Sequence, residues 1–173
     1  MRIPIRSTHL VRYGALAIAA TAVTTLAGAP ATAAAGSQSR QMRHYDSGLL
    51  KDTNSVRAEY GTHDYRANHK LWRISHAYAE HLAATGQLVH NPNLESEVSR
   101  ACPDWTSLGE NIGVSTGGGS GAHQMFEAYM HSPPHRANLL DSSYRQVGIA
   151  TVKVTRHGKV QKWNVMDFAN HCH

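Results

Sequence analysis

The stretch "SPPHRANLLDSSYRQVGIA", residues 132–150, decides how the rest of the chain is interpreted. Proline is tolerated in the first turn of a helix, because its missing N–H would have no partner there. With Ser132 as the N-cap, Pro133 and Pro134 take the first two helical positions, and the helix continues through "HRANLL". The residues after "DSSY" are rich in β-branched side chains. The stretch therefore predicts a short helix that is followed by a strand.

The same prolines separate two histidines that would otherwise resemble a zinc pair. His131 and His135 are four residues apart, but they would face one another only inside a continuous helix. His131 lies before the predicted helix start, so this pair is broken. His135 lies at the positive end of the helix dipole, which favours the neutral ring that a metal ligand or general base needs. A hydrogen-bonded structural histidine is the alternative.

Three further segments predict helices from the spacing of their apolar residues. The first covers residues 47–61, with Asp46 or Ser47 as its N-cap and a glycine at its end. The second covers residues 71–86, has the strongest apolar stripe and also ends at a glycine. The third covers residues 122–131. We therefore expect most of the helices to precede the strands.

The C-terminal part predicts an antiparallel hairpin. Residues 144–155 and 159–169 are rich in β-branched and aromatic side chains, and "RHGK" joins them with a glycine where a positive φ is needed. The fold class is thus α+β with layered elements. Residues 87–121 are rich in turn residues, and the glycine run at residues 115–121 predicts a mobile surface loop. Too few apolar residues flank this run for two separate cores.

The N-terminus has the three parts of a secretory signal peptide. Residues 1–35 contain three arginines, a short apolar core and small residues at cleavage-type positions, with processing expected after Ala33 or Ala35. A permanent membrane anchor is less favoured, because the apolar core is short and no stop-transfer charges follow it. We therefore expect a secreted, extracellular monomer with a flexible mature N-terminus at residues 36–46 and a single domain at residues 47–173.

The composition argues against a nucleic-acid partner. The chain has 17 Lys+Arg and 12 Asp+Glu, for a net charge of +5. Removing the predicted signal peptide takes away three arginines and no acids, which leaves 14 basic and 12 acidic side chains and a charge of +2. No basic run remains that could follow a phosphate backbone.

The two cysteines, Cys102 and Cys172, fit an exported protein with one disulfide. This bond would close a loop of about 70 residues and stabilise the fold by about 4 kcal/mol in the chain-entropy model. The alternative is a metal site built from "HCH" at residues 171–173, but no closely spaced second cysteine supports it. We expect the disulfide.

Four motifs give the chain a family resemblance. The opening stretch resembles the "SPGHRxNIL…VGIG" signature of bacterial secreted proteins of the CAP superfamily, which contains cysteine-rich secretory, antigen 5 and pathogenesis-related proteins. "NSVRAEYG" at 54–61, "LVH" at 88–90 and "GENIG" at 109–113 resemble three more family motifs in the right order. Together the motifs cover about residues 49–168.

The resemblance implies a three-layer α-β-α sandwich with a central cleft. Carried over by motif, His90, Glu110 and His135 line this cleft, and in several family members such residues bind a divalent metal, often zinc. Ser132 stands where the eukaryotic branch has a second glutamate. A metal would then be held by the two histidines and Glu110, with water completing the shell. The alternative for Glu110 is that its carboxylate only braces its own loop.

Asn111, Arg136 and Asn138 lie within or beside these motifs. Their side chains fit structural roles, because short amides and guanidinium groups readily hydrogen-bond to nearby backbone groups. We expect them to hold the Glu110 segment and the His135 helix together.

Two functions from different classes remain open. The first is a non-enzymatic secreted module that binds a small ligand, a lipid, a cell-envelope component or a host partner. The second is a zinc-assisted hydrolase, in which Glu110 would be the catalytic base toward a water held at His90 and His135. Nucleophilic catalysis has no support, because no "GxSxG" elbow occurs. The first is favoured, because the second acid is missing and a fold does not by itself fix a reaction.

Overall fold

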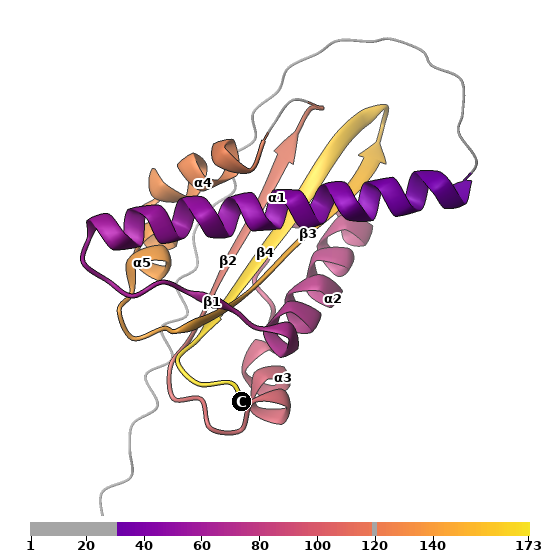
Figure 1. Cartoon of the computed structure of the whole chain (residues 1–173). Coiled ribbons are helices and arrows are strands. Elements are labelled where there is room, and N and C mark those ends of the chain that lie inside the picture. Colours follow the sequence, from indigo (N-terminus) through magenta and orange to yellow (C-terminus); the bar gives the residue numbers. More distant parts are fainter. Residues whose placement is uncertain (1–30, 119–120) are drawn as a thin grey trace, which may run out of the picture.

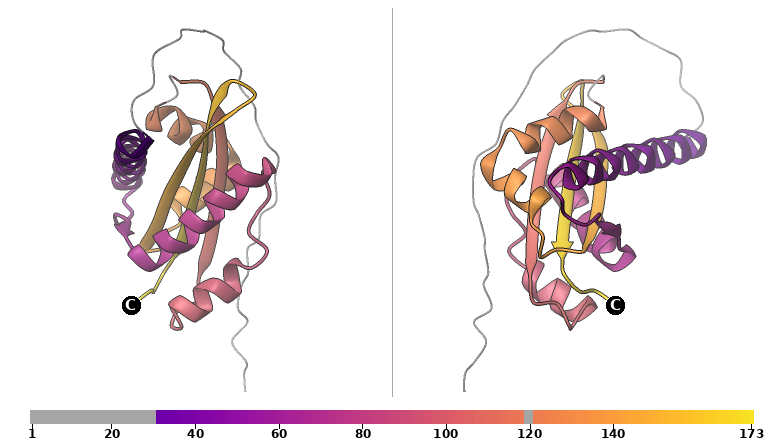
Figure 2. Two further views of the ribbon diagram at one scale, coloured as in Figure 1. Left: turned by 90° about the vertical axis from the view of Figure 1, so that its right-hand side faces the viewer. Right: turned by 60° about the vertical axis from the view of Figure 1, so that its left-hand side comes forward.

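A mixed four-stranded sheet lies between two layers of helices (Figures 1 and 2). The computed structural model describes residues 31–118 and 121–173. In chain order the elements are α1 (Ala31–Glu59), β1 (Arg66–Ala67), α2 (His69–Thr85), α3 (Leu94–Ala101), β2 (Leu108–Thr116), α4 (Ala122–Met130), α5 (Pro133–Leu140), β3 (Gln146–Arg156) and β4 (Lys159–Ala169). The predicted α-β-α sandwich is confirmed.

The sheet order is β1-β3-β4-β2, which makes β2 an edge strand. The predicted hairpin is confirmed: β3 and β4 pair antiparallel through a turn at His157 and Gly158, whose φ angles of 49° and 73° are both positive. β2 pairs antiparallel with β4, and β1 pairs parallel with β3. The strand that carries the "GEN" motif therefore lies at one side of the sheet, next to the second strand of the hairpin.

The two helical layers cover opposite faces of the sheet. Figure 2 shows α1, α4 and α5 on one face and α2 with α3 on the other. The first face buries Leu49, Tyr129 and Phe168 in one cluster, and the second buries Leu71 and Val98 in another. Helix α5 begins at Pro133 with Ser132 at the N-cap position, as the prolines predict.

Helix α2 lies very close to β3 because of Gly148. A Cβ at this position would lie 2.3 Å from the backbone carbonyl carbon of Leu71 and 2.4 Å from the backbone N of Trp72. The hydroxyl of Ser75, one turn further along α2, lies within hydrogen-bond distance of the carbonyl oxygen of Gly148 at 3.1 Å. Any side chain at position 148 would push the helix away from the sheet.

The structure corrects the prediction of a flexible segment at residues 36–46. These residues form part of α1, which begins at Ala31, so Asp46 and Ser47 are not N-caps. The physical reason is tertiary packing: Met42 and Tyr45 are each 7% exposed in the same cluster as Leu49. Residues 1–30 of the predicted signal peptide lie outside the described residues. In the described part of the chain, no helix has the length and apolar character to cross a membrane.

The segment expected to be only turn-rich contains two elements, α3 and β2. Directly after α3, Cys102 forms the predicted disulfide with Cys172. The chain next to this bond is held further by Asn68, whose Nδ2 donates to the carbonyl oxygen of Cys172 at 2.8 Å. Lys70 Nζ donates to the carbonyl oxygens of Ala101 and His173. The C-terminal residues are thereby fastened to α2 and α3.

Candidate functional site

His90 and Glu110 form a close pair at the β2 edge of the sheet. His90 lies in the connection between α2 and α3, and Glu110 lies on β2. The Nδ1 atom of His90 is 2.6 Å from Oε1 of Glu110, and the backbone N–H of Asn91 donates to the same oxygen at 3.0 Å. Because an ionised carboxylate can only accept, Nδ1 of His90 carries the hydrogen. Glu110 therefore orients the His90 ring, and its side chain is only 2% exposed.

His135, on α5, is the second histidine at this edge. Its ring meets the ring of Tyr129 edge-on, with centroids 5.0 Å apart. Burial, together with the nearby His90, lowers the pKa of His135 to about 4. The ring is neutral at physiological pH, as the sequence predicts, although burial rather than the helix dipole is the main cause. We define His90, Glu110 and His135 as the β2-edge site.

Two asparagines join the elements that carry the site. Asn111 Nδ2 donates to the carbonyl oxygen of His135 at 3.0 Å, and Asn138 Nδ2 donates to the carbonyl oxygen of Glu110 at 3.1 Å. Asn138 Nδ2 also donates to Oδ1 of Asn111 at 2.9 Å. Asn111 of β2 thus holds the backbone of α5 at His135, and Asn138 of α5 holds the backbone of β2 at Glu110. The predicted role of both asparagines is confirmed.

Arg57 fixes the other end of α5. Its guanidinium is fully buried, lies 3.6 Å from the ring centroid of Tyr65 and donates from Nη1 to the carbonyl oxygens of Leu139 and Asp141 at 2.8 and 3.0 Å. A positive charge at the C-terminal end of a helix interacts favourably with the helix dipole. The motif at residues 54–61 therefore holds the C-terminal end of α5, although it lies far from His135 in the sequence.

Asp167 is a neighbour of the site that the sequence analysis missed. It lies on β4 directly opposite Glu110, is fully buried, and accepts a hydrogen bond from the hydroxyl of Ser75 at 2.7 Å. Burial raises the pKa of Asp167 well above its ordinary value, and the negative charge of Glu110 raises it further. The available signal was an acid directly between the apolar residues Met166 and Phe168, because an acid is rarely buried without a partner.

The remaining predicted residue, Ser132, lies at the N-cap position of α5, and its hydroxyl does not cap the helix. Its contribution to the site stays a prediction. His131 ends α4, where its Nδ1 lies 2.8 Å from the carbonyl oxygen of Glu127. Arg136 differs from the prediction, since its guanidinium donates to the hydroxyl of Tyr60 at 2.7 Å rather than to the Glu110 segment.

The metal role of His90, Glu110 and His135 stays a prediction. Within residues 31–118 and 121–173, no group of three or more His, Cys, Asp or Glu side chains is arranged to hold a metal ion. Oxygen Oε1 of Glu110 already accepts two hydrogen bonds, from His90 and Asn91. Glu110 thus orients the His90 ring through Oε1, whereas its Oε2 has no hydrogen-bond partner among the described residues.

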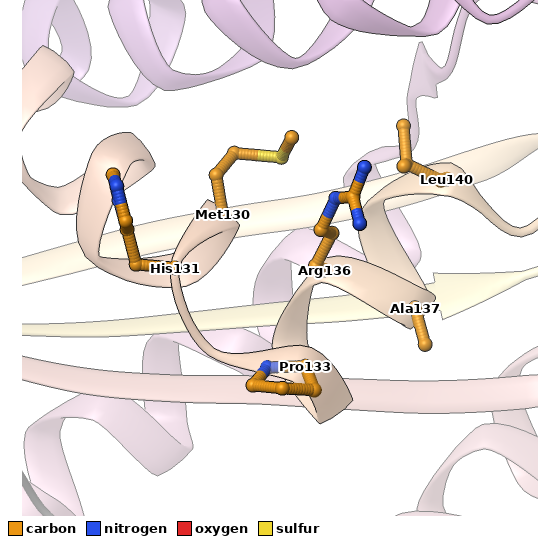
Figure 3. A pocket seen from close by; sticks show the side chains of 6 residues that line it. All are labelled: Met130, His131, Pro133, Arg136, Ala137 and Leu140. Atoms are coloured by element: carbon orange, nitrogen blue, oxygen red, sulfur yellow. The ribbon is translucent and has the colours of Figure 1, made fainter.

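A separate pocket lies where α4 meets α5. Its volume is about 390 Å³, and Figure 3 shows that its lining comes from the end of α4 and one side of α5. The lining residues are Met130, His131, Pro133, Arg136, Ala137 and Leu140. The guanidinium of Arg136 lies 5.5 Å from the ring centroid of Tyr60, a side chain that is 55% exposed. The pocket thus combines apolar walls with one cationic group.

The chain matches a family model and several solved structures. The family model, described as CAP, cysteine-rich secretory protein family, matches residues 50–168. A comparison with curated proteins gives no match. An outer surface protein from Borrelia burgdorferi is 13% identical, with a TM-score of 0.60, and the match covers 71% of this chain and 90% of that chain.

Two further structures come from longer bacterial proteins. An extracellular protein with an SCP domain from Bacillus anthracis is 16% identical, with a TM-score of 0.64, over 78% of this chain and 43% of that chain. A cysteine-rich secretory protein from Staphylococcus aureus is 19% identical, with a TM-score of 0.60, over 75% of this chain and 39% of that chain. The chain thus spans less than half the length of these two proteins, and at such identities the likeness concerns the fold alone.

Proposed function

The chain belongs to the cysteine-rich secretory protein (CAP) family, and from this premise we propose that it is a secreted, monomeric binding module without catalytic activity of its own. Export would follow from the predicted signal peptide at residues 1–35, and the disulfide between Cys102 and Cys172 suits an oxidising compartment. No fold-level likeness fixes a reaction, so the proposal depends on the geometry of the β2-edge site.

The proposal rests on one observation, the hydrogen bonding and burial of the Glu110 carboxylate. A general base must reach the proton it removes, directly or through one water. Oxygen Oε1 of Glu110 accepts hydrogen bonds from His90 and Asn91, and the side chain is 2% exposed. This arrangement supports a bracing role for the carboxylate. It gives no particular support to the zinc-assisted hydrolase, which requires Glu110 to act on a water.

The lining of the pocket between α4 and α5 supports a proposal for the class of ligand that the module binds. Met130, Leu140 and Ala137 offer apolar contact, and Arg136 can hydrogen-bond to an anionic group. The volume of about 390 Å³ suits one medium-sized apolar group. The ligand we propose is a cell-envelope or small-molecule component that places a carboxylate or phosphate beside an apolar group.

The test is retention of the oxidised mature protein on isolated cell-envelope material. We expect Ala137→Trp, which fills the pocket, and Arg136→Gln, which removes its cation, each to lower retention at least tenfold. Lys159→Gln removes an exposed charge at the hairpin turn and serves as the matched control. Equal retention of all four proteins would exclude the pocket as the binding site. Hydrolysis of ester or peptide substrates that disappears in Glu110→Gln would overturn the non-enzymatic proposal.

A further inference from the structure

Two buried carboxyl groups lie on adjacent strands, and one of them contacts His90. Glu110 on β2 and Asp167 on β4 are direct partners in the antiparallel register. Such partners project from the same face of a sheet, with Cβ atoms about 4.5–5.5 Å apart. Asp167 is 0% exposed and Glu110 is 6% exposed. The pair therefore lies in the protein interior, where two adjacent negative charges are strongly unfavourable.

Each carboxyl group has one oxygen with a partner and one without. Glu110 Oε1 accepts from His90 and Asn91, and Asp167 Oδ2 accepts from the Ser75 hydroxyl. Among the described residues, Glu110 Oε2 and Asp167 Oδ1 are buried without any hydrogen-bond partner. Both orphaned atoms are oxygens, so neither can donate unless a hydrogen is bound to one of them. One hydrogen between the two oxygens would satisfy both.

We propose that Asp167 is a positioning residue, which shares one hydrogen between its Oδ1 and Oε2 of Glu110 and thereby fixes the ring of His90. The chain of contacts runs from Ser75 on α2, through Asp167 and Glu110, to the imidazole at the β2 edge. This role concerns the unliganded protein, so it goes beyond the binding function proposed above and does not depend on the identity of a ligand.

The surroundings of Asp167 identify it as the group that carries the hydrogen. Burial raises its pKa strongly, the charges of Glu110 and Glu97 raise it as well, and the hydrogen bond from Ser75 opposes them. A hydrogen on Oδ2, directed at Ser75, would leave both orphaned oxygens unsatisfied. A hydrogen on Oδ1 satisfies both, and Oδ2 remains free to accept from the serine.

The experiment follows the His90 ring by NMR in the folded, oxidised protein. Long-range ¹H–¹⁵N spectra distinguish the Nδ1–H form of a histidine from the Nε2–H form, and His90→Gln identifies the relevant signals. In the wild type we expect His90 in the Nδ1–H form with a slowly exchanging, downfield ring proton. Asp167→Asn retains a donor toward Glu110, because its amide NH₂ replaces the shared hydrogen while its oxygen accepts from Ser75.

Asp167→Asn is therefore expected to keep the His90 signature, and Asp167→Val is expected to lose the downfield proton. Ser75→Ala is the matched control, because it removes a contact to Asp167 but leaves the link to Glu110, so the signature should persist. If Asp167→Val does not fold, Asp167→Ser decides the matter, since its hydroxyl lies one bond closer to the backbone than the Asp167 oxygens and should also lose the signal. A signature that persists in Asp167→Val or Asp167→Ser, or that Asp167→Asn loses, overturns the proposal.

Discussion

The Nδ1 atom of His90 lies 2.6 Å from Oε1 of Glu110, so the acid of the "GEN" motif is a hydrogen-bond partner of the histidine. In metal sites, a carboxylate in this position orients an imidazole whose other nitrogen binds the ion. Here only one more imidazole, that of His135, is available from the predicted set. Two neutral nitrogen ligands hold zinc more weakly than a complete set of three or four.

We accordingly expect the oxidised protein, dialysed against micromolar zinc at pH 7 and then against buffer, to retain far less than one zinc per chain. Metal content by inductively coupled plasma mass spectrometry checks this. His90→Ala and His135→Ala should give the same low value as the wild type. One zinc per wild-type chain that both variants lose would show that the two histidines bind the ion and would contradict this expectation.

The lowered pKa of His135 should make the fold less stable in mild acid, because the unfolded chain then binds a proton that the folded protein does not. Because burial lowers its folded pKa to about 4, the folded state binds fewer protons than the unfolded state between pH 6.5 and about 4. Its contribution to the free energy of unfolding is complete above pH 6.5 and falls as the pH drops through this range. Allowing for partial exposure of the ring, the loss is roughly 1–2 kcal/mol.

Denaturant unfolding of the wild type and of His135→Phe at pH 7 and pH 4.5 measures this effect. The variant should lose about 1–2 kcal/mol less than the wild type on acidification. His44→Gln, at an exposed position on α1, serves as the control and should follow the wild type. Parallel losses in all three proteins would mean that other groups cause the acid sensitivity.

Gly148→Ala should be among the most destabilising single methyl additions in the chain. The new Cβ would lie 2.3 Å from a backbone atom of Leu71, and a backbone atom cannot move aside as a flexible side chain can. We expect a loss of about 1–3 kcal/mol in the free energy of unfolding, the usual range for overpacking. Gly118→Ala meets no atom within 4 Å and should change stability little. Equal stability of the two variants would contradict the close approach of α2 to β3.

Reduction of the Cys102–Cys172 disulfide should lower stability by about 4 kcal/mol, because the bond joins residues 70 apart and restricts the unfolded chain. Thermal or denaturant unfolding with and without a reductant measures the change. The double variant Cys102→Ala/Cys172→Ala should match the reduced protein and should not respond to the reductant. A reduced protein as stable as the oxidised one would show that the contacts of Asn68 and Lys70 hold the C-terminal residues by themselves.

Local rules predict some parts of this fold well. The helix start at Pro133 follows from the missing N–H of proline. The hairpin turn follows from a glycine, Gly158, which can adopt the positive φ that such a turn requires. These features depend on a few neighbouring residues, which the sequence displays directly.

Other parts depend on distant segments, and the sequence alone did not reveal them. Strand β2, "LGENIGVST", contains glycine, glutamate and asparagine, which have low strand propensity, and it is ordered by pairing with β4. The early turns of α1 lack a local apolar pattern, but Met42 and Tyr45 are buried by tertiary packing. Asp167 approaches Glu110 only through the β2–β4 register, so its place beside the site could not be predicted from spacing.

The reciprocal contacts of Asn111 and Asn138 have a consequence for how such a domain can diversify. They tie β2 to α5 through backbone carbonyls, so the frame is independent of the side chains that face the pocket between α4 and α5. Ala137 can therefore be exchanged without loss of these two contacts, whereas Arg136 also joins α5 to the end of α1 through Tyr60. A prearranged scaffold loses little conformational entropy on association. In evolutionary terms, the side chains that line the pocket and the asparagine that ties α5 to β2 are encoded by separate positions of one helix.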